Sequence, residues 1–73
     1  MYTRKIRLSR ETVQPFVNAA SRCDFHIDVS NDRMTVSAKS IMGVFSLDLT
    51  HELTVKYPER DEQFEVVLNQ LAA

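Results

Sequence analysis

The sequence has very little cysteine, glycine or proline, and it has no tryptophan. Its one cysteine, Cys23, cannot form a disulfide within the chain and cannot belong to a cysteine cluster that binds metal. Its one glycine, Gly43, excludes the glycine-rich loops that cradle nucleotide phosphates. A disulfide scaffold and a nucleotide loop are therefore excluded, and a reducing cytoplasm is the expected location.

The chain also lacks an excess of charge of either sign. Nine Lys and Arg residues face ten Asp and Glu residues, so the formal net charge is −1. Proteins that bind nucleic acid or an anionic membrane surface usually carry a basic excess. We therefore expect neither of these partners.

Long apolar runs are missing as well. No run approaches the roughly 20 residues of a membrane span, and residues 1–6 are too polar to open a signal peptide. Hydrophobic residues make up 44% and charged residues 26% of the 73 positions, as in an ordinary globular protein. This length predicts a single domain, residues 1–73, with no room for a second core.

The first half of the chain alternates and then becomes helical. In residues 2–8, Ile6 and Leu8 face one side and Lys5 and Arg7 the other, which predicts a half-buried strand. Residues 11–22 have helical spacing of apolar positions, namely Val13, Phe16, Val17 and Ala20. Pro15 is tolerable if this helix begins near residue 11 or 12, because it then lies in the first turn.

Three more alternating segments and a final helix follow. Residues 25–30 and 34–37 predict a hairpin, because Asn31 and Asp32 between them favour a turn. Residues 53–57 predict the fourth strand, and residues 58–61 interrupt it. The last helix is expected to begin at Arg60 or Asp61, with an apolar stripe formed by Phe64, Val67, Leu68 and Leu71.

Residues 38–49 are the segment around which the chain is organised. Ser40 is expected to be an N-cap, because its hydroxyl can accept a backbone N–H of the first helical turn. Met42 and Phe45 are three positions apart, so a helix that begins after Ser40 places them on one side. The segment predicts a short amphipathic helix with a polar start.

The element order is therefore β-α-β-β-α-β-α. Cleanly alternating strands indicate an antiparallel sheet that is exposed on one face and covered by helices on the other. The fold class is α+β. No metal cluster, cofactor motif or nucleophile–base pair is visible, so we expect no cofactor and no enzyme activity.

Residues 39–47, Lys-Ser-Ile-Met-Gly-Val-Phe-Ser-Leu, resemble the regulatory-serine motif of HPr, the small phosphocarrier of the bacterial sugar phosphotransferase system. The resemblance implies an open-faced β-sandwich of four antiparallel strands under three helices, in the order found above. Two positions differ from the motif. Phe45 replaces a methionine, and Asp48 replaces a glycine or small residue.

The phosphocarrier half of the HPr pattern is missing. HPr proteins carry the phosphoryl group on a histidine at the start of the first helix, within a Gly-Ile-His-Ala-Arg-Pro-Ala motif. The corresponding positions here are Ser9, Arg10, Glu11 and Thr12, and no histidine precedes His26. We expect His26 and His51 to be solvated surface residues. Ordinary phosphocarrier activity and binding of Enzyme I are therefore not expected.

The regulatory half of the pattern is present. The resemblance implies phosphorylation of Ser40 by HPr kinase/phosphorylase, as in catabolite-repression HPr, which also lacks the active histidine. It further implies that a catabolite-control transcription factor binds a patch formed by Lys39, Ile41, Met42 and Phe45. Two alternatives stay open: an interaction or structural domain in which Ser40 is only a cap, and a phosphocarrier that uses a non-standard residue.

Overall fold

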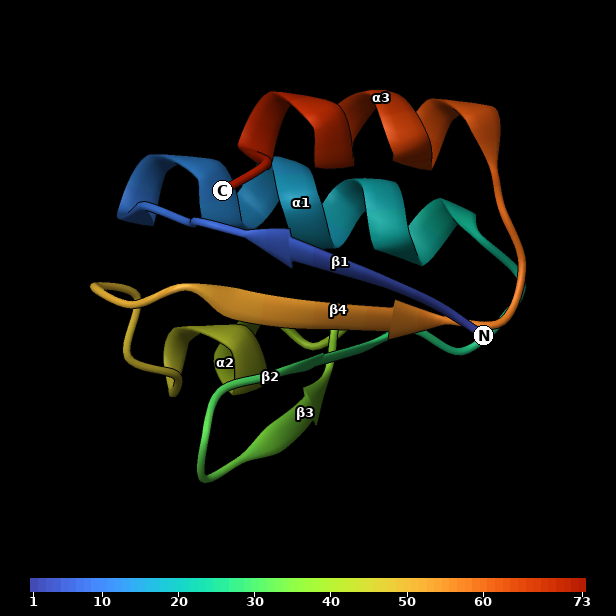
Figure 1. The fold of residues 1–73 in the computed structure, drawn as a ribbon. Helices are drawn as coiled ribbons and strands as arrows, with labels where there is room; N and C mark the ends of the chain where they lie inside the picture. Colours follow the sequence, from blue (N-terminus) through green and yellow to red (C-terminus); the bar gives the residue numbers. More distant parts are fainter.

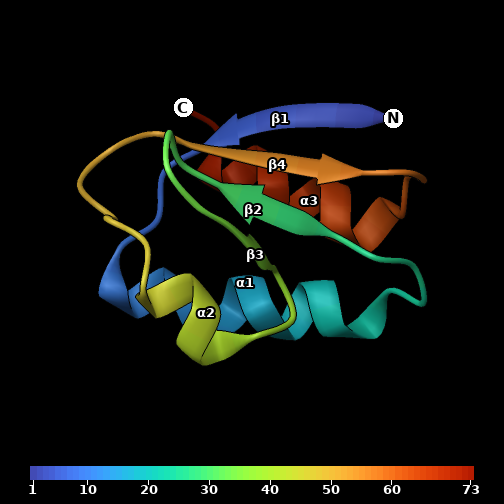
Figure 2. The same ribbon diagram turned by 90° about the horizontal axis from the view of Figure 1, so that it is seen from below.

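The chain forms one antiparallel sheet and three helices. In a computed structural model, which describes residues 1–73, the elements are β1 (Tyr2–Ile6), α1 (Arg10–Arg22), β2 (Asp28–Ser30), β3 (Thr35–Ser37), α2 (Ile41–Phe45), β4 (Leu53–Tyr57) and α3 (Glu62–Leu71). The sheet order is β1-β4-β2-β3, and every neighbouring pair is antiparallel. Figures 1 and 2 together show that all three helices lie on one face of this sheet. The predicted α+β open-faced sandwich is confirmed.

The core lies between the sheet and the helices. Fully buried side chains come from both layers, among them Val29 and Val55 of the sheet, Phe16 of α1 and Phe64 of α3. Each of these removes apolar surface from water, which is the main driving force for folding. No polar or charged residue is buried.

The other face of the sheet is uncovered and polar. The strand registers align two rows of residues across all four strands: Thr3, Lys56, Asp28 and Ser37, and then Lys5, Thr54, Ser30 and Thr35. None of the eight is buried. The expected alternation between a dry and a wet face is confirmed in β2 and β4, whereas β3 has no buried residue and Tyr2 in β1 is exposed.

The start of α1 differs from the prediction. The helix begins at Arg10 with Ser9 as its N-cap, and Pro15 therefore lies inside the helix, beyond the first turn. A proline at that depth removes the hydrogen bond that its N–H would give to the carbonyl of Glu11. Pro15 is exposed, and the apolar residues on the buried side of α1 hold the helix against the sheet.

Three strands are shorter than predicted. β1 ends at Ile6, the last residue that pairs with β4, and the C-terminal residues pair with the other edge of β1. The Arg7 N–H donates to the Leu71 carbonyl at 2.9 Å, and Ala72 forms a bridge with Ile6. Residues 25–27 precede β2 as irregular chain, and β3 begins at Thr35. β4 has the predicted bounds.

A polar cluster fastens α3 to the sheet. The Tyr57 hydroxyl donates to Glu65 Oε2 at 2.6 Å, and Arg4 pairs with Glu65 Oε1 at 3.1 Å. Asp61 caps α3 by accepting the Phe64 N–H at 2.9 Å. Asp61 is one of the two residues at which the sequence predicted the start of this helix. None of the helices has the length and apolar character that crossing a membrane requires.

Candidate functional site at the Ser40 helix

Ser40 is the N-cap of α2, as predicted. Its backbone is extended, with φ −102° and ψ 109°, and its Oγ accepts the Gly43 N–H at 3.1 Å. Ser40 is exposed, so the hydroxyl is accessible from solvent. The cap therefore fixes the position of the oxygen at the helix start and leaves it open.

Gly43 makes room for this cap. A Cβ at position 43 would lie 3.0 Å from Ser40 Oγ and 3.3 Å from Val36 Cβ. The only glycine in the chain is thus required here by close approach of the helix to its own cap and to β3. Its backbone dihedral angles are ordinary, since no glycine has a positive φ.

Two backbone donors at the start of α2 are unused. The N–H groups of Ile41 and Met42 make no hydrogen bond within the chain. The first N–H groups of any helix have no partner inside that helix and carry a partial positive charge. An anionic group attached to Ser40 would therefore meet two free donors.

The predicted patch divides into exposed and supporting residues. Met42 is 82% exposed and Phe45 is 47% exposed, and they are two of the six exposed large hydrophobic residues of the chain. Ile41 is half-buried, and Val44 packs into the core. Lys39 is also half-buried, and its Nζ donates to the Cys23 carbonyl at 2.7 Å. The accessible apolar surface is thus Met42 with Phe45.

The start of α1 is closed by its own side chains. The Ser9 N–H donates to Thr12 Oγ1 at 2.8 Å, and the Thr12 hydroxyl donates to the Ser9 carbonyl at 3.2 Å. Ser9, Arg10 and Glu11 are exposed, and Thr12 is half-buried. The four residues lie together around one helix end, as their sequence positions require.

Glu11 places a negative charge at this helix end. Interaction with its own backbone N–H, and then with the Ser9 hydroxyl, lowers the pKa of Glu11. A lowered pKa means that the carboxylate form is preferred there. The position that would attract an anion at the start of α1 therefore has an anion of the chain beside it.

Both histidines lie on the surface. His26 Nε2 is 2.7 Å from Asp28 Oδ1, and the His26 side chain is 71% exposed. His51 Nε2 is 3.5 Å from Asp48 Oδ2, and its side chain is 76% exposed. Each is a solvated surface residue, as the sequence predicts.

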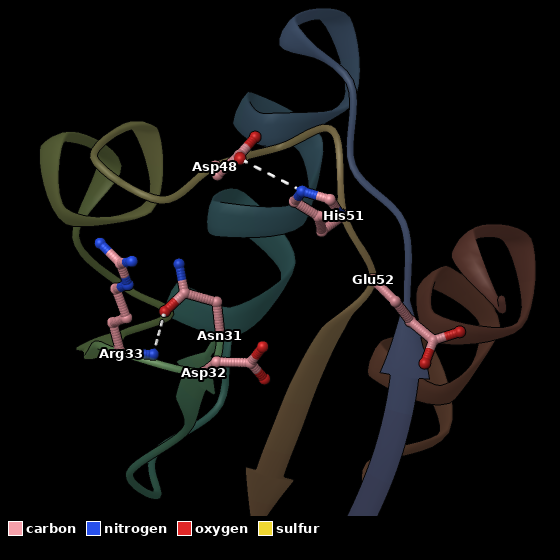
Figure 3. A pocket seen from close by; sticks show the side chains of 6 residues that line it. All are labelled: Asn31, Asp32, Arg33, Asp48, His51 and Glu52. Atoms are coloured by element: carbon pink, nitrogen blue, oxygen red, sulfur yellow. Dashed lines mark hydrogen bonds and ion pairs between the residues drawn. The ribbon is translucent and has the colours of Figure 1, made fainter.

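The sequence did not reveal a polar cavity beside α2. The turn between β2 and β3 supplies Asn31, Asp32 and Arg33, and the loop after α2 supplies Asp48, His51 and Glu52 (Figure 3). The cavity volume is about 390 Å³, and none of its lining residues is hydrophobic. No group of His, Cys, Asp and Glu in the structure could hold a metal ion.

Asp48 takes part in the loop structure. The Thr50 hydroxyl donates to Asp48 Oδ1 at 2.6 Å, and the Thr50 N–H donates to the same oxygen at 3.0 Å. These two bonds, the hydroxyl first, lower the pKa of Asp48. Asp48 therefore stabilises the turn that follows α2. This is the position at which the HPr motif has a glycine or a small residue.

Comparisons with known proteins agree with this geometry. The family model for PTS-HPr, described as the PTS HPr component phosphorylation site, matches residues 8–73. HPr-C-His from Thermoanaerobacter tengcongensis has a TM-score of 0.81 and 26% sequence identity, over 97% of this chain and 91% of that one. No curated protein matches the chain significantly.

A second solved structure is of the same kind. The phosphocarrier protein HPr from Bacillus anthracis str. Ames has a TM-score of 0.74 and 26% identity, over 96% of this chain and 95% of that one. The family model covers all but the first seven residues, and both neighbours share the complete fold. The chain belongs to the HPr family of the phosphotransferase system.

Proposed function

We propose that this HPr-family chain is a regulatory binding protein that acts through the Ser40 helix and not through histidine phosphotransfer. The observation that carries the proposal is the exposed Ser40 hydroxyl at the start of α2, next to the exposed apolar pair Met42 and Phe45. The absence of any histidine before His26 supports the second half of the proposal.

Phosphorylation of Ser40 is the proposed switch. The γ-phosphoryl group of ATP passes to Ser40 Oγ, the bond to the β-phosphate breaks, ADP leaves, and the hydroxyl proton passes to a base of the kinase. The product carries about −1.5 to −2 charges at the helix start. The free N–H groups of Ile41 and Met42 favour those charges, so the switch changes the surface with little change of fold.

The proposed partners are proteins. HPr kinase/phosphorylase would modify Ser40, and a catabolite-control transcription factor would bind the patch of Lys39, Ile41, Met42 and Phe45. Met42 and Phe45 would supply most of the contact, since buried apolar side chains at the centre of an interface usually dominate its affinity. With these partners, the proposed location is the cytoplasm.

Enzyme I is not among the proposed partners. To accept a phosphoryl group from Enzyme I, the start of α1 would need a nucleophilic side chain and a helix N-terminus with no anion beside it. The hydroxyl groups of Ser9 and Thr12 are hydrogen-bonded to each other, and the Glu11 carboxylate repels a second anion. We likewise propose neither catalysis by this chain nor binding of nucleic acid or membrane.

The test is phosphorylation with purified HPr kinase and ATP, followed by mass spectrometry of the intact chain and its peptides. We expect one phosphate on Ser40 in the natural sequence and none in Ser40→Ala. Ser21→Ala is the matched control, because Ser21 is an exposed serine of α1, outside the Ser40 helix, and the variant should leave the modification unchanged.

Two results would contradict the proposal. Absence of phosphate on Ser40 would leave Ser40 as a cap and the chain as an interaction domain without this switch. An acid-labile phosphate formed with Enzyme I and phosphoenolpyruvate would instead show that the chain is a phosphocarrier with a non-standard acceptor.

A further inference from the structure

Residues 37–40 connect β3 to α2 and determine where Ser40 lies. The Ser40 N–H donates to the Ser37 carbonyl at 3.1 Å, and the Lys39 N–H donates to Ser37 Oγ at 3.2 Å. Ala38 is fully buried, and its N–H donates to the Ile27 carbonyl at 2.9 Å. These bonds hold the connection to the edge of the sheet, and none of them reaches α1.

α2 packs directly against α1, and the Lys39 side chain adds a hydrogen bond from the connection to the end of α1. Its Nζ donates at 2.7 Å to the carbonyl of Cys23, which is the C-cap residue of α1 and lies 16 positions earlier in the chain. The last carbonyls of a helix have no partner within the helix and carry partial negative charge. A lysine ammonium satisfies such a carbonyl and also interacts favourably with the helix dipole.

The surroundings of this contact also favour a cation. The charges of Asp61 and Asp24 act on the Cys23 thiol in the opposite sense to the charge of Lys39. The bond that places the ammonium is the one to the Cys23 carbonyl. Lys39 is half-buried, so water competes less for this bond than it would at a free surface lysine.

α2 needs such external attachments. It has only five residues, and isolated helices shorter than about 12 residues are marginal in water. Its position therefore depends on its cap, on the burial of Val44, and on the connection before Ser40. Among the side chains of that connection, only Lys39 bonds to α1.

We propose that Lys39 is a positioning residue of the Ser40 helix: it links the start of that helix to the C-terminal end of α1 through the Cys23 carbonyl. The partner then contacts Met42 and Phe45 on a surface whose orientation Lys39 maintains. The inference deepens the proposed function: it gives Lys39, a member of the partner-binding patch, a positioning role as well. Only the kinase test of this inference rests on the proposed function.

Amide hydrogen exchange tests the positioning role without any partner. Lys39→Met keeps the aliphatic stem and removes the donor, and we expect exchange at Gly43 and Val44 to accelerate about tenfold. The Val29 and Val55 amides of the sheet report global unfolding and should change much less. Lys56→Met, at an exposed lysine on the uncovered sheet face, is the matched control and should change neither.

Two further readouts separate positioning from general structural damage. The carbonyl carbon resonance of Cys23 should shift in Lys39→Met and stay in place in Lys56→Met, because only the first variant loses the bond to that carbonyl. Lys39→Arg restores a cationic donor and should recover at least part of the exchange protection of α2.

Phosphorylation of Ser40 by HPr kinase supplies the functional readout. KM depends on the fraction of molecules in which α2 is correctly placed, so KM should rise in Lys39→Met only as far as that fraction falls below one, with kcat little changed. Unchanged exchange at Gly43 and Val44, or equal acceleration in α2 and the sheet, would overturn the inference. Loss of all modification in the natural chain would overturn the proposed function, and the exchange result would still decide the role of Lys39.

Discussion

The Ser40 oxygen has a structural bond in the unmodified chain. It accepts the Gly43 N–H and so satisfies one of the donors that a helix start leaves unpaired. Modification would keep an oxygen at this position and add charge next to two unused N–H groups. A single side chain can thus be both a cap and a phosphate acceptor, because the two roles use different lone pairs and the same helix end.

Ser40→Ala should lower the free energy of unfolding by about 1 kcal/mol, because the Gly43 N–H loses its partner. Ser40→Asp should retain most of that free energy, since aspartate is an equally good cap. Urea unfolding measures both variants. Ser21→Ala, at an exposed serine of α1 that makes no side-chain hydrogen bond, is the control and should change little. An equal loss in both alanine variants would argue against a specific cap.

Glu11, at the start of α1, should make the stability of the folded chain depend on pH. Its pKa is lower in the folded chain than in the unfolded chain. The stability that it contributes is therefore present above its unfolded pKa and is lost as the pH falls through the folded pKa. Between about pH 6 and pH 3, unfolding free energy should fall less steeply in Glu11→Gln than in the natural chain. Glu59→Gln, in the exposed loop after β4, is the control.

At the scale of elements, α2 depends on the residues that flank it more than on its own five residues. Ser40 caps the helix through the Gly43 N–H, Gly43 lies close to β3, and Lys39 bonds to the end of α1. A docking surface built on such an element is accurately placed only while these contacts hold. The short length of α2 makes each of them important.

Gly43→Ala should destabilise the chain by about 1 kcal/mol, although alanine is the better helix former. The new methyl group would lie 3.0 Å from Ser40 Oγ and 3.3 Å from both Ser40 Cβ and Val36 Cβ. The two Cβ atoms are fixed to the backbone and cannot turn away. The cost should shrink in a Ser40→Ala background, where the shortest contact disappears. Thermal unfolding of the four variants of this cycle gives the coupling, and strict additivity would contradict the explanation.

Elements that depend on local patterns could be predicted, and contacts between distant segments could not. Residues 53–57 were predicted as a strand with the bounds that β4 has, and the caps Ser40 and Asp61 follow from local side-chain chemistry. The bridge between Ile6 and Ala72 joins the two ends of the chain, and no local pattern indicates it.

The candidate site shows the same division. The placement of Met42 and Phe45 on one side follows from helical spacing. Their exposure and the Lys39 contact with Cys23 depend on how the segments pack together. The cavity between Arg33 and Asp48 also forms from two loops that are distant in sequence. Pro15 misled the prediction because buried side chains on the other side of α1 outweigh its lost hydrogen bond.

At the scale of the molecule, Tyr57, Glu65 and Arg4 join β4, α3 and β1. Tyr57 is almost fully buried, and its hydroxyl donates to a carboxylate that also pairs with Arg4 and Arg60. This cluster closes the side of the sandwich that is farthest along the sheet from β3 and α2. Changes in it should therefore alter overall stability and leave the Ser40 surface intact.

Tyr57→Phe should cost about 1–3 kcal/mol of unfolding free energy, because Glu65 loses a buried donor. Burial first, and then the hydrogen bond to Glu65, raises the pKa of Tyr57 to about 12. Stability from Tyr57 is thus complete below the ordinary tyrosine pKa and is lost between about pH 10 and pH 12.

That alkaline slope should be reduced in Tyr57→Phe. Tyr2→Phe is the matched control, because Tyr2 is 44% exposed and its hydroxyl makes no hydrogen bond. Chemical unfolding across this pH range distinguishes the two variants. An identical slope in both would show that Glu65 does not hold the Tyr57 proton.

The uncovered polar sheet face offers a site for chemical attachment. Thr35 belongs to one of the two polar rows and is exposed, on the face opposite the helices. Cys23 is only 5% exposed and burial raises the pKa of its thiol, so a Thr35→Cys variant would be labelled at the new position. A surface-coupled sensor made in this way would present the Ser40 helix outward, and captured proteins could be read directly from the chip.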